Sequence, residues 1–539
     1  MRCFLVWRGA GRLGLFVFVV AALLLIGVGR ASAATLNVCP SGCPYAQLAP
    51  ALAAAKDGDT IKIAPGTYAG GVTIDVSVKL VGAGAGQTVI SGGGPVLTIG
   101  AFGESTEPTV SIDGVTITGG VTRSSPESTP FVGQEGVFAA GGGVEIPPNA
   151  DFSGGATVTI TNSVITGNRV APTDTVPFGP PCPSGPCPFA FAGGGGIDSW
   201  GTLTLENTTI SNNRVGSASG LSTLASDAQG GAMISRLDAL TIKNSVISDN
   251  AASATAPNGR FAEGGGIFAP GGTLTISDSA VTGNSALLEA SLPNTVELLA
   301  QSGGIFIAEN RATITATTIS GNSAAMTNTA GDATAFSGGV NVGSEVEFRM
   351  SNSVIADNRV NSATLTGSQG NAEGDTGGGA LLGTVTNTRI SGNTVTVSSA
   401  AGDAFAAIGG LLQFGSLTNS VVSNNQLRAS SPTGSVSVIG AGVIVAEHTL
   451  TLRNTTVSGN TGDASGPSGF ARGGGIYDGP FFDIAGSPLV LMNSSVTGNV
   501  LTGSAGITLQ GGGLYIQNQP LTLTHSVIAG NSPDQCYGC

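Results

Sequence analysis

Short stretches of alternating apolar and polar residues return along this chain at a nearly constant spacing. In the copy from Gly264 to Asn284, glycines precede Ile267, and Leu274 and Ile276 then alternate with polar residues. A period of two residues is typical of a strand with one covered face. Each copy ends in an asparagine, and neighbouring asparagines lie 32 to 45 residues apart. They are Asn168, Asn213, Asn250, Asn284, Asn322, Asn358, Asn393, Asn425, Asn460, Asn499 and Asn531.

Repetition at this period is typical of solenoids, propellers and arrays. Three short strands and three bends account for about 21 residues of each copy. No single copy can bury its apolar face, so we expect parallel pairing between neighbouring copies. The pattern therefore predicts an all-β fold, a parallel β-helix solenoid of about 13 coils over residues 61–539 and roughly 60 Å long.

Two polar columns mark the bends of the predicted coil. The residue before the terminal asparagine is Gly, Asn or Asp, as in Gly167, Asn212 and Asp249, which predicts a positive φ there. A second column, six residues before the terminal asparagine, is mostly Asn. Stacked asparagines can hydrogen-bond from coil to coil, so we interpret both columns, including Asp249 and Asp357, as structural.

A variable segment separates each terminal asparagine from the next run of glycines. Residues 394–408 alternate, then turn at Ala401-Gly-Asp403, then alternate again. We predict hairpin insertions that stack on one side of the solenoid as a wing. Insertions collected on one face are often a binding surface; a passive edge that shields the stack is the alternative.

The N-terminal region divides into two predicted segments. Residues 1–33 combine Arg2 and Arg8 with an apolar run and end in Ala31-Ser-Ala33, which indicates a cleaved secretory signal peptide; an uncleaved membrane anchor is the alternative. Residues 34–60 hold apolar positions at helical spacing between Tyr45 and Ala55, which predicts a short capping helix. We expect a secreted, extracellular protein without a membrane span after cleavage.

Charge and cysteine usage agree with an exported chain. The 20 Lys and Arg against 33 Asp and Glu disfavour nucleic acid as a partner, because nucleic acid is bound through basic patches. Six cysteines follow the signal segment in three close pairs, which favours local disulfides over a zinc site. The candidate pairs are Cys39 with Cys43, Cys182 with Cys187, and Cys536 with Cys539.

Two resemblances extend this interpretation. Gly58-Asp-Thr-Ile-Lys-Ile-Ala-Pro-Gly-Thr-Tyr68, followed by Val78-Lys-Leu-Val-Gly-Ala-Gly84, resembles the first turns of pectate-lyase-like right-handed parallel β-helices. The resemblance implies a right-handed solenoid. The runs Gly194-Gly-Gly-Ile197 and Ile165-Thr-Gly-Asn168 are similar to polymorphic outer-membrane protein repeats, in which the second motif has Phe where Ile165 stands.

The sequence assigns no catalytic, cofactor-binding or metal-binding residue. Polysaccharide-degrading β-helix enzymes use clustered carboxylates, and Asp198, Glu206 and Asp238 are candidates that no pattern distinguishes. We predict a secreted structural or binding module, with carbohydrate binding or adhesion as its form and an extracellular polysaccharide or cell-surface component as partner. The alternative is a lyase or glycoside hydrolase that acts on an acidic polysaccharide.

Overall fold

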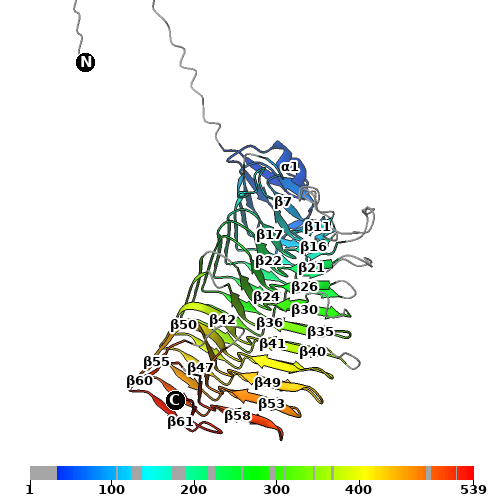
Figure 1. Cartoon of the computed structure of the whole chain (residues 1–539). Coiled ribbons are helices and arrows are strands. Elements are labelled where there is room, and N and C mark those ends of the chain that lie inside the picture. The colour runs from blue at the N-terminus through cyan, green and yellow to red at the C-terminus, as the bar shows by residue number, and fades with distance from the viewer. Residues whose placement is uncertain are drawn as a thin grey trace, which may run out of the picture.

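The chain folds as a right-handed parallel β-helix, in which coils stack from one end of the molecule to the other (Figure 1). The computed structural model describes residues 33–104, 107–123, 136–172, 189–216, 225–255, 259–291, 298–308, 311–343, 346–365, 370–480, 487–517 and 519–539. The one helix among these residues is α1 (Leu48–Ala54). The predicted signal segment lies outside the described residues except for Ala33, and the pair Cys182 and Cys187 lies outside them entirely.

One coil contributes a strand or two to each of four sheets, which we name A to D. In one coil, β17 (Ile197–Ser199) and β18 (Leu203–Glu206) belong to sheet A and β19 (Thr209–Ser211) belongs to sheet B. The same coil then enters the wing with β20 (Arg214–Gly216) of sheet C and β21 (Ala225–Gln229) of sheet D. Each strand pairs in parallel with its counterpart in the next coil. Sheets A and B run the length of the stack, whereas sheets C and D begin at β10 (Val121–Thr122) and β11 (Gly136–Ala140), after the first coils.

Sheets A and B enclose the main core. Inward positions of successive coils lie directly on one another, as in the register of Leu203 with Leu240 and of Ile210 with Ile247. All four side chains are at most 1% exposed. The alternation that predicted strands with one covered face therefore corresponds to columns of stacked aliphatic residues.

The terminal asparagines form a buried hydrogen-bonded ladder. Asn284 Nδ2 donates to Asn322 Oδ1 at 3.0 Å and to the Ile247 carbonyl at 3.0 Å, and the Asn284 backbone amide donates to the same Asn322 Oδ1. The pattern recurs from Asn168 to Asn531, where Gln535 Oε1 accepts the last two bonds at 3.1 and 3.0 Å. Each buried amide is thus satisfied by its neighbours.

The bends carry the left-handed backbone conformation that the sequence predicted for one column of residues. A second column has the same conformation, which was not predicted. Asn212, Asp249 and Asp357 have φ values of 56°, 58° and 56°, which confirms the column before the terminal asparagine. The second polar column is also left-handed throughout, as at Asn207, where φ is 51°. Asn tolerates this region better than most residues, so local geometry explains that column as well as hydrogen bonding does.

A ladder of hydroxyls follows the second polar column, and we did not predict it. Ser245 Oγ accepts a hydrogen bond from the Thr208 amide, and Ser279 Oγ accepts one from the Ser245 amide, both at 3.1 Å. The same bond links Thr317 to Ser353 and Thr388 to Ser420. These hydroxyls supply acceptors to amides that the bend removes from the strand ladder.

The wing is made of arches rather than hairpins. In the insertion 394–408, β44 (Thr394–Ser398) pairs with β48 (Gln426–Ser430), and β45 (Ala404–Ala407) pairs with β49 (Ser435–Ile439), in both cases in the next coil. Among the described residues, no strand of sheet C pairs with a strand of sheet D, although the Ser362 hydroxyl of sheet C donates to the Ala333 carbonyl of sheet D at 2.8 Å. They meet through small apolar side chains such as Ala406 and Val397. The expected pairing within each insertion is therefore wrong, and the wing is two stacked parallel sheets.

Small residues occupy the neck where the wing leaves the coil. A Cβ at Gly266 would lie 2.6 Å from the Gly304 carbonyl oxygen and 3.2 Å from the Asn284 side chain. Neighbouring coils and the asparagine ladder therefore favour glycine at this neck, and the one coil with Ala232 in the same column carries no more than a methyl group there.

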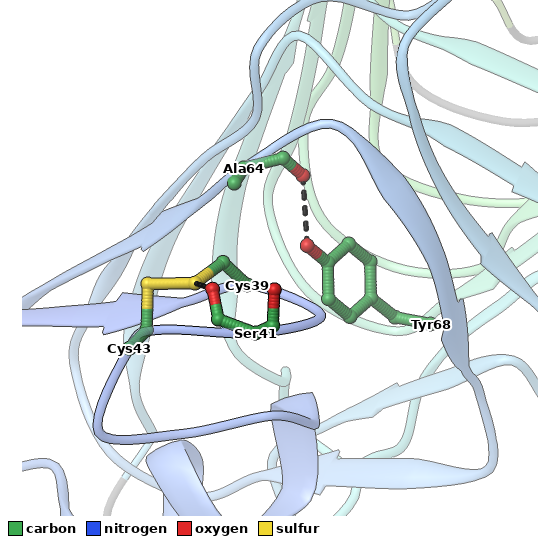
Figure 2. Close-up of a disulfide and its surroundings, with 5 residues drawn as sticks. All are labelled: Cys39, Ser41, Cys43, Ala64 and Tyr68. Atoms are coloured by element: carbon green, nitrogen blue, oxygen red, sulfur yellow. Dashed lines mark hydrogen bonds between the residues drawn. A yellow bond between two sulfur atoms is a disulfide. The ribbon is translucent and has the colours of Figure 1, made fainter.

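The N-terminal end holds α1, which Figure 1 shows at the end of the stack. Its apolar residues Leu48, Ala51 and Leu52 are buried in the main core. The adjacent loop is closed by the Cys39–Cys43 disulfide, as predicted, and lies near Tyr68, whose hydroxyl donates to the Ala64 carbonyl at 2.9 Å (Figure 2). Cys536 is joined to Cys539 at the other end.

Candidate functional site

One column of side chains on the outer face of sheet A is polar in its first four coils and mostly apolar in later ones. It runs through Thr73 of β4 (Val72–Ile74), Thr98 of β7 (Leu97–Ile99), Glu145 of β12 (Val144–Ile146) and Asp198, which are in register on neighbouring strands. In the next two coils the same column holds Ile234 and Phe268. Side chains in register lie about 4.8 Å apart. Two hydroxyls and two carboxylates therefore follow one another along the axis of the β-helix formed by sheets A and B, which we call the rod.

This column lies beside the wing. The strand that precedes β12 is β11 (Gly136–Ala140) of sheet D, and the one that precedes β17 is β16 (Phe189–Gly193). Outer side chains of sheet D and of sheet A pack together in one cluster, which contains Phe138, Phe191 and Ile234. The inner corner between wing and rod thus shields Glu145 and Asp198, which are 3% and 1% exposed.

Arg236 fixes Asp198 from the adjacent coil. Its Nε donates to Oδ1 at 2.9 Å and its Nη2 to Oδ2 at 2.7 Å, which is the two-point geometry of a strong ion pair. The guanidinium carbon also lies 4.8 Å from the ring centre of Phe191 and 5.2 Å from that of Trp200. Charge pairing and ring contacts together hold the guanidinium in place.

Aromatic rings connect this ion pair to the outer end of the column. Trp200 contacts Phe152 edge to face with ring centres 5.8 Å apart, and Phe152 contacts Phe102 in the same way at 5.6 Å. Phe102 is partly exposed. A series of three rings therefore leads from Arg236 to the surface.

A hollow of about 600 Å³ opens at Phe102. Its wall includes the Phe102 ring, the hydroxyl-bearing Thr73 and Thr98, and Glu145. The rest of the wall is backbone of glycines, Ala101 and two prolines. A ring beside hydroxyls and a carboxylate provides an apolar face and polar groups for one ligand, the composition expected of a small-molecule or sugar site.

Burial raises the pKa of two acids, of which one lies behind the wall of the hollow. Glu107 lies behind Gly100 of the wall, where a Cβ would be 3.3 Å from its Oε2, and burial raises the pKa of Glu107. Burial likewise raises the pKa of Asp238, against a hydrogen bond from Thr202. Both acids are therefore protonated more readily than free carboxyls.

The three acids that the sequence offered as candidates are separated by the fold. Asp198 lies in the polar column, whereas Glu206 forms an exposed pair with Lys243 at 3.3 Å. Asp238 lies in the bend after β22 (Met233–Ser235), near Gly154. The two histidines, His448 and His525, are exposed. Glu145 and Phe102 were missed. For Glu145 a signal was visible, because an acid stands at the second residue after the glycine run, where most later coils carry an apolar residue; Phe102 belongs to no repeat and had no such signal.

A second group of acids lies on the wing. Glu373 and Asp375 are two residues apart on the same face of β41 (Ala372–Asp375). Burial raises the pKa of Asp375 to about 7, although the Thr376 hydroxyl donates to its Oδ1 at 2.8 Å. Burial, with Asp332 nearby, also raises the pKa of Glu373.

Within the described part of the chain, no three His, Cys, Asp or Glu side chains gather in a way that could hold a metal ion. Within the same residues, no helix has the length and apolar character needed to cross a membrane.

Comparisons with known proteins give no family. No protein-family model and no curated protein matches the chain. The catalytic domain of a GH87 alpha-1,3-glucanase in complex with nigerose has a TM-score of 0.25 and 12% identity, over 91% of this chain and 68% of that chain. The Azotobacter vinelandii mannuronan C-5 epimerase AlgE4 A-module has a TM-score of 0.21 and 13% identity, over 91% of this chain and 93% of that chain. Similarity at this level identifies neither a common site nor a common reaction.

Proposed function

We propose that this chain is a secreted β-helix protein that binds an extracellular polysaccharide in the hollow beside Phe102. The observation that carries the proposal is the wall itself, where an aromatic ring, two threonines and a carboxylate surround about 600 Å³. Sugar rings have apolar faces that pack on aromatic side chains and hydroxyls that bond to polar ones.

The position of the hollow suits a chain-like ligand. Thr73, Thr98 and Glu145 are in register on three consecutive strands, so polar contacts repeat along the rod axis. Three strands span about 10 Å. A polymer laid along the axis would meet a new row of side chains at each coil.

Binding accounts for this geometry better than catalysis does. General acid and base work at a glycosidic bond needs two carboxyl groups that reach the substrate. Asp198, the neighbour of Glu145 in the column, is not part of the wall of the hollow, and both of its carboxylate oxygens accept hydrogen bonds from Arg236. The column thus presents one carboxyl group to the hollow, and we propose a binding protein rather than the lyase or hydrolase.

Affinity electrophoresis of the mature chain in gels that contain individual polysaccharides tests the proposal. We expect retardation by at least one polymer, and Phe102→Ala should weaken it about 5- to 10-fold, the effect of roughly 1 kcal/mol of ring contact. The matched control is Phe470→Ala, which removes a partly buried ring from the wing near the other end of the rod. Equal loss in both variants, or release of new reducing ends from the polymer, would contradict a binding site at the hollow.

Secretion is tested separately. Expression of the full chain in a secreting host should yield an extracellular protein whose N-terminal residue is Ala34. Retention of residues 1–33 on a membrane-associated product would instead support the anchor.

A further inference from the structure

We infer that the outer face of sheet B carries a second sugar site, around Arg389 of β43 (Arg389–Ser391), which binds neutral hydroxyl-bearing rings independently of the hollow beside Phe102. The face is otherwise uniform, because Arg389 is the one charged residue in the fourteen described strands of sheet B. The outward residues of the other strands are Thr, Ser, Val or Ala, as in β14 (Val164–Thr166). A single exception in so regular a repeat marks a position that the fold does not require.

A hollow of about 390 Å³, which we call the sheet B hollow, lies beside this arginine. Val354 and Ala356 of β39 (Val354–Ala356) form the apolar part of its wall. Gly392 stands in the bend column between Asp357 of the preceding coil and Asn424 of the next one. Because residue 392 has no side chain, the space between the other two side chains is open to a ligand.

The charged groups of the sheet B hollow are available to a ligand. Arg389 Nε donates to Ser391 Oγ at 2.9 Å, which fixes the guanidinium along the strand, whereas its two Nη nitrogens donate to no acceptor among the described residues. Asp357 is exposed and forms no ion pair in the described part of the chain. Its Oδ1 lies across Gly392, where a Cβ would overlap it. A cation and an anion therefore stand at one hollow without pairing with each other.

Sugar hydroxyls suit this combination of groups. A hydroxyl can accept a hydrogen bond from Arg389 and donate one to the Asp357 carboxylate, and the Asn424 amide can do either. A carboxylate or sulfate would instead meet the like charge of Asp357, and an ammonium group would meet that of Arg389. The apolar part of the wall gives one face of the ring a surface to pack on. Sheets A and B enclose the core and their outer faces look away from each other, so a protein with both sites could join two polysaccharide molecules.

Affinity electrophoresis of the mature chain on hydroxyethyl cellulose, dextran and galactomannan tests the site in a Phe102→Ala background, where the first hollow is weakened. We expect residual retardation by at least one of these neutral polymers, and at least fivefold weaker binding when Arg389→Met or Gly392→Asn is added. Arg389→Met removes the charge and keeps the aliphatic stem. Gly392→Asn fills the sheet B hollow with the residue type that the same column carries at Asn212 and Asn424.

The matched controls are Arg428→Met and Gly498→Asn, which should change binding less than twofold. Arg428 is an exposed arginine that donates to Gln426 Oε1, two residues away, at 3.2 Å. Gly498 has a φ of 65° in the same bend column, and a Cβ there would meet open space. Circular dichroism verifies that all four variants fold.

The outcomes separate this inference from the proposed function. Loss of all retardation in Phe102→Ala alone, or equal binding by the added variants and their controls, would overturn the inference. Weakening by Arg389→Met in the parent chain, with none by Phe102→Ala, would support the inference and contradict the site at Phe102. Displacement of the polymer by glycine, which carries one charge of each sign, would assign the sheet B hollow to a zwitterion and overturn the inference. If none of the polymers binds, both fail.

Discussion

Arg236 holds Asp198 through two hydrogen bonds of 2.9 and 2.7 Å across the boundary between two coils. Because Asp198 is 1% exposed, loss of the arginine would leave a buried carboxylate without its counter-ion. We expect Arg236→Ala to lower the free energy of unfolding by about 3–5 kcal/mol, measured by chemical denaturation. Lys243→Ala breaks a pair of which both side chains are well exposed and should cost less than about 1 kcal/mol. Similar losses for the two variants would refute the structural role assigned to the buried pair.

The asparagine ladder gives a second prediction, on one coil. Asn322→Ala would remove the acceptor for two hydrogen bonds from Asn284 and the donor to Asn358 Oδ1. With about 1–3 kcal/mol for each buried group left unsatisfied, we expect a loss of about 3–5 kcal/mol.

The control for the ladder is Asn352→Gly, in the exposed second column. Asn352 has a φ of 53° and accepts one exposed hydrogen bond from Asn387. Glycine tolerates that φ, so the loss should stay below about 1 kcal/mol. In Asn322→Ala, hydrogen exchange should become faster mainly in the coils next to residue 322. Unchanged protection in those coils would contradict the proposal that the ladder stabilises neighbouring coils.

Stability is expected to depend on pH through Asp375. Its folded pKa of about 7 lies above the ordinary value of 3.8, so the folded state binds the proton more tightly than the unfolded state does. The resulting contribution is present at acidic pH and is lost as the pH rises from about 4 to about 7. Asp375→Asn should therefore raise the unfolding midpoint at pH 8 and have little effect at pH 4, as thermal melts can show.

A matched substitution controls for the exchange of Asp for Asn. Asp357→Asn changes a residue of the turn column in which other coils carry Asn212 or Asn424. Its effect sets the background against which the Asp375 variant is compared. A rise in midpoint for Asp375→Asn that is equal at pH 4 and pH 8 would rule out titration as its cause.

The wing offers a prediction about deletions. Removal of residues 394–408 takes one strand from sheet C and one from sheet D, and so leaves β40 (Arg359–Thr364) and β48 without a partner on one side. We expect the rod to stay folded, with a lower unfolding temperature and faster hydrogen exchange in the flanking arches. Loss of far-ultraviolet circular dichroism from the whole chain would show instead that the wing and the rod fold as one unit.

Columns made of one residue type were visible in the sequence, and columns that depend on pairing between distant segments were not. The terminal asparagines and the alternating aliphatic residues predicted the coil, because the residue type at each of these positions indicates its structural role. The arches of 394–408 were taken for hairpins, because alternation is the same whether a strand pairs with its own partner or with the next coil. The hydroxyl ladder escaped notice because Ser245 and Ser279 resemble ordinary bend residues.

The candidate site shows a different limit. Three coils contribute to this site, with Glu145, Asp198 and Arg236 on successive coils. Their proximity depends on the register between the coils and on the orientation of the Arg236 side chain toward the preceding coil. Their one sequence signal is the polar residue that stands where later coils place Ile234 and Phe268. The hollow needed the structure, because Phe102 lies in an irregular segment that no repeat describes.

The register of the four sheets has a consequence for how such a chain can change in length. A duplicated repeat adds one strand to sheets B, C and D, extends sheet A and inserts one further asparagine between two others, so every layer of the molecule grows together. An insertion of part of a repeat would displace Gly266 from the neck and Asn284 from its partner at once. The chain is therefore expected to gain or lose whole coils. The hollow near the first coils would keep its shape however many coils are added beyond Asn531.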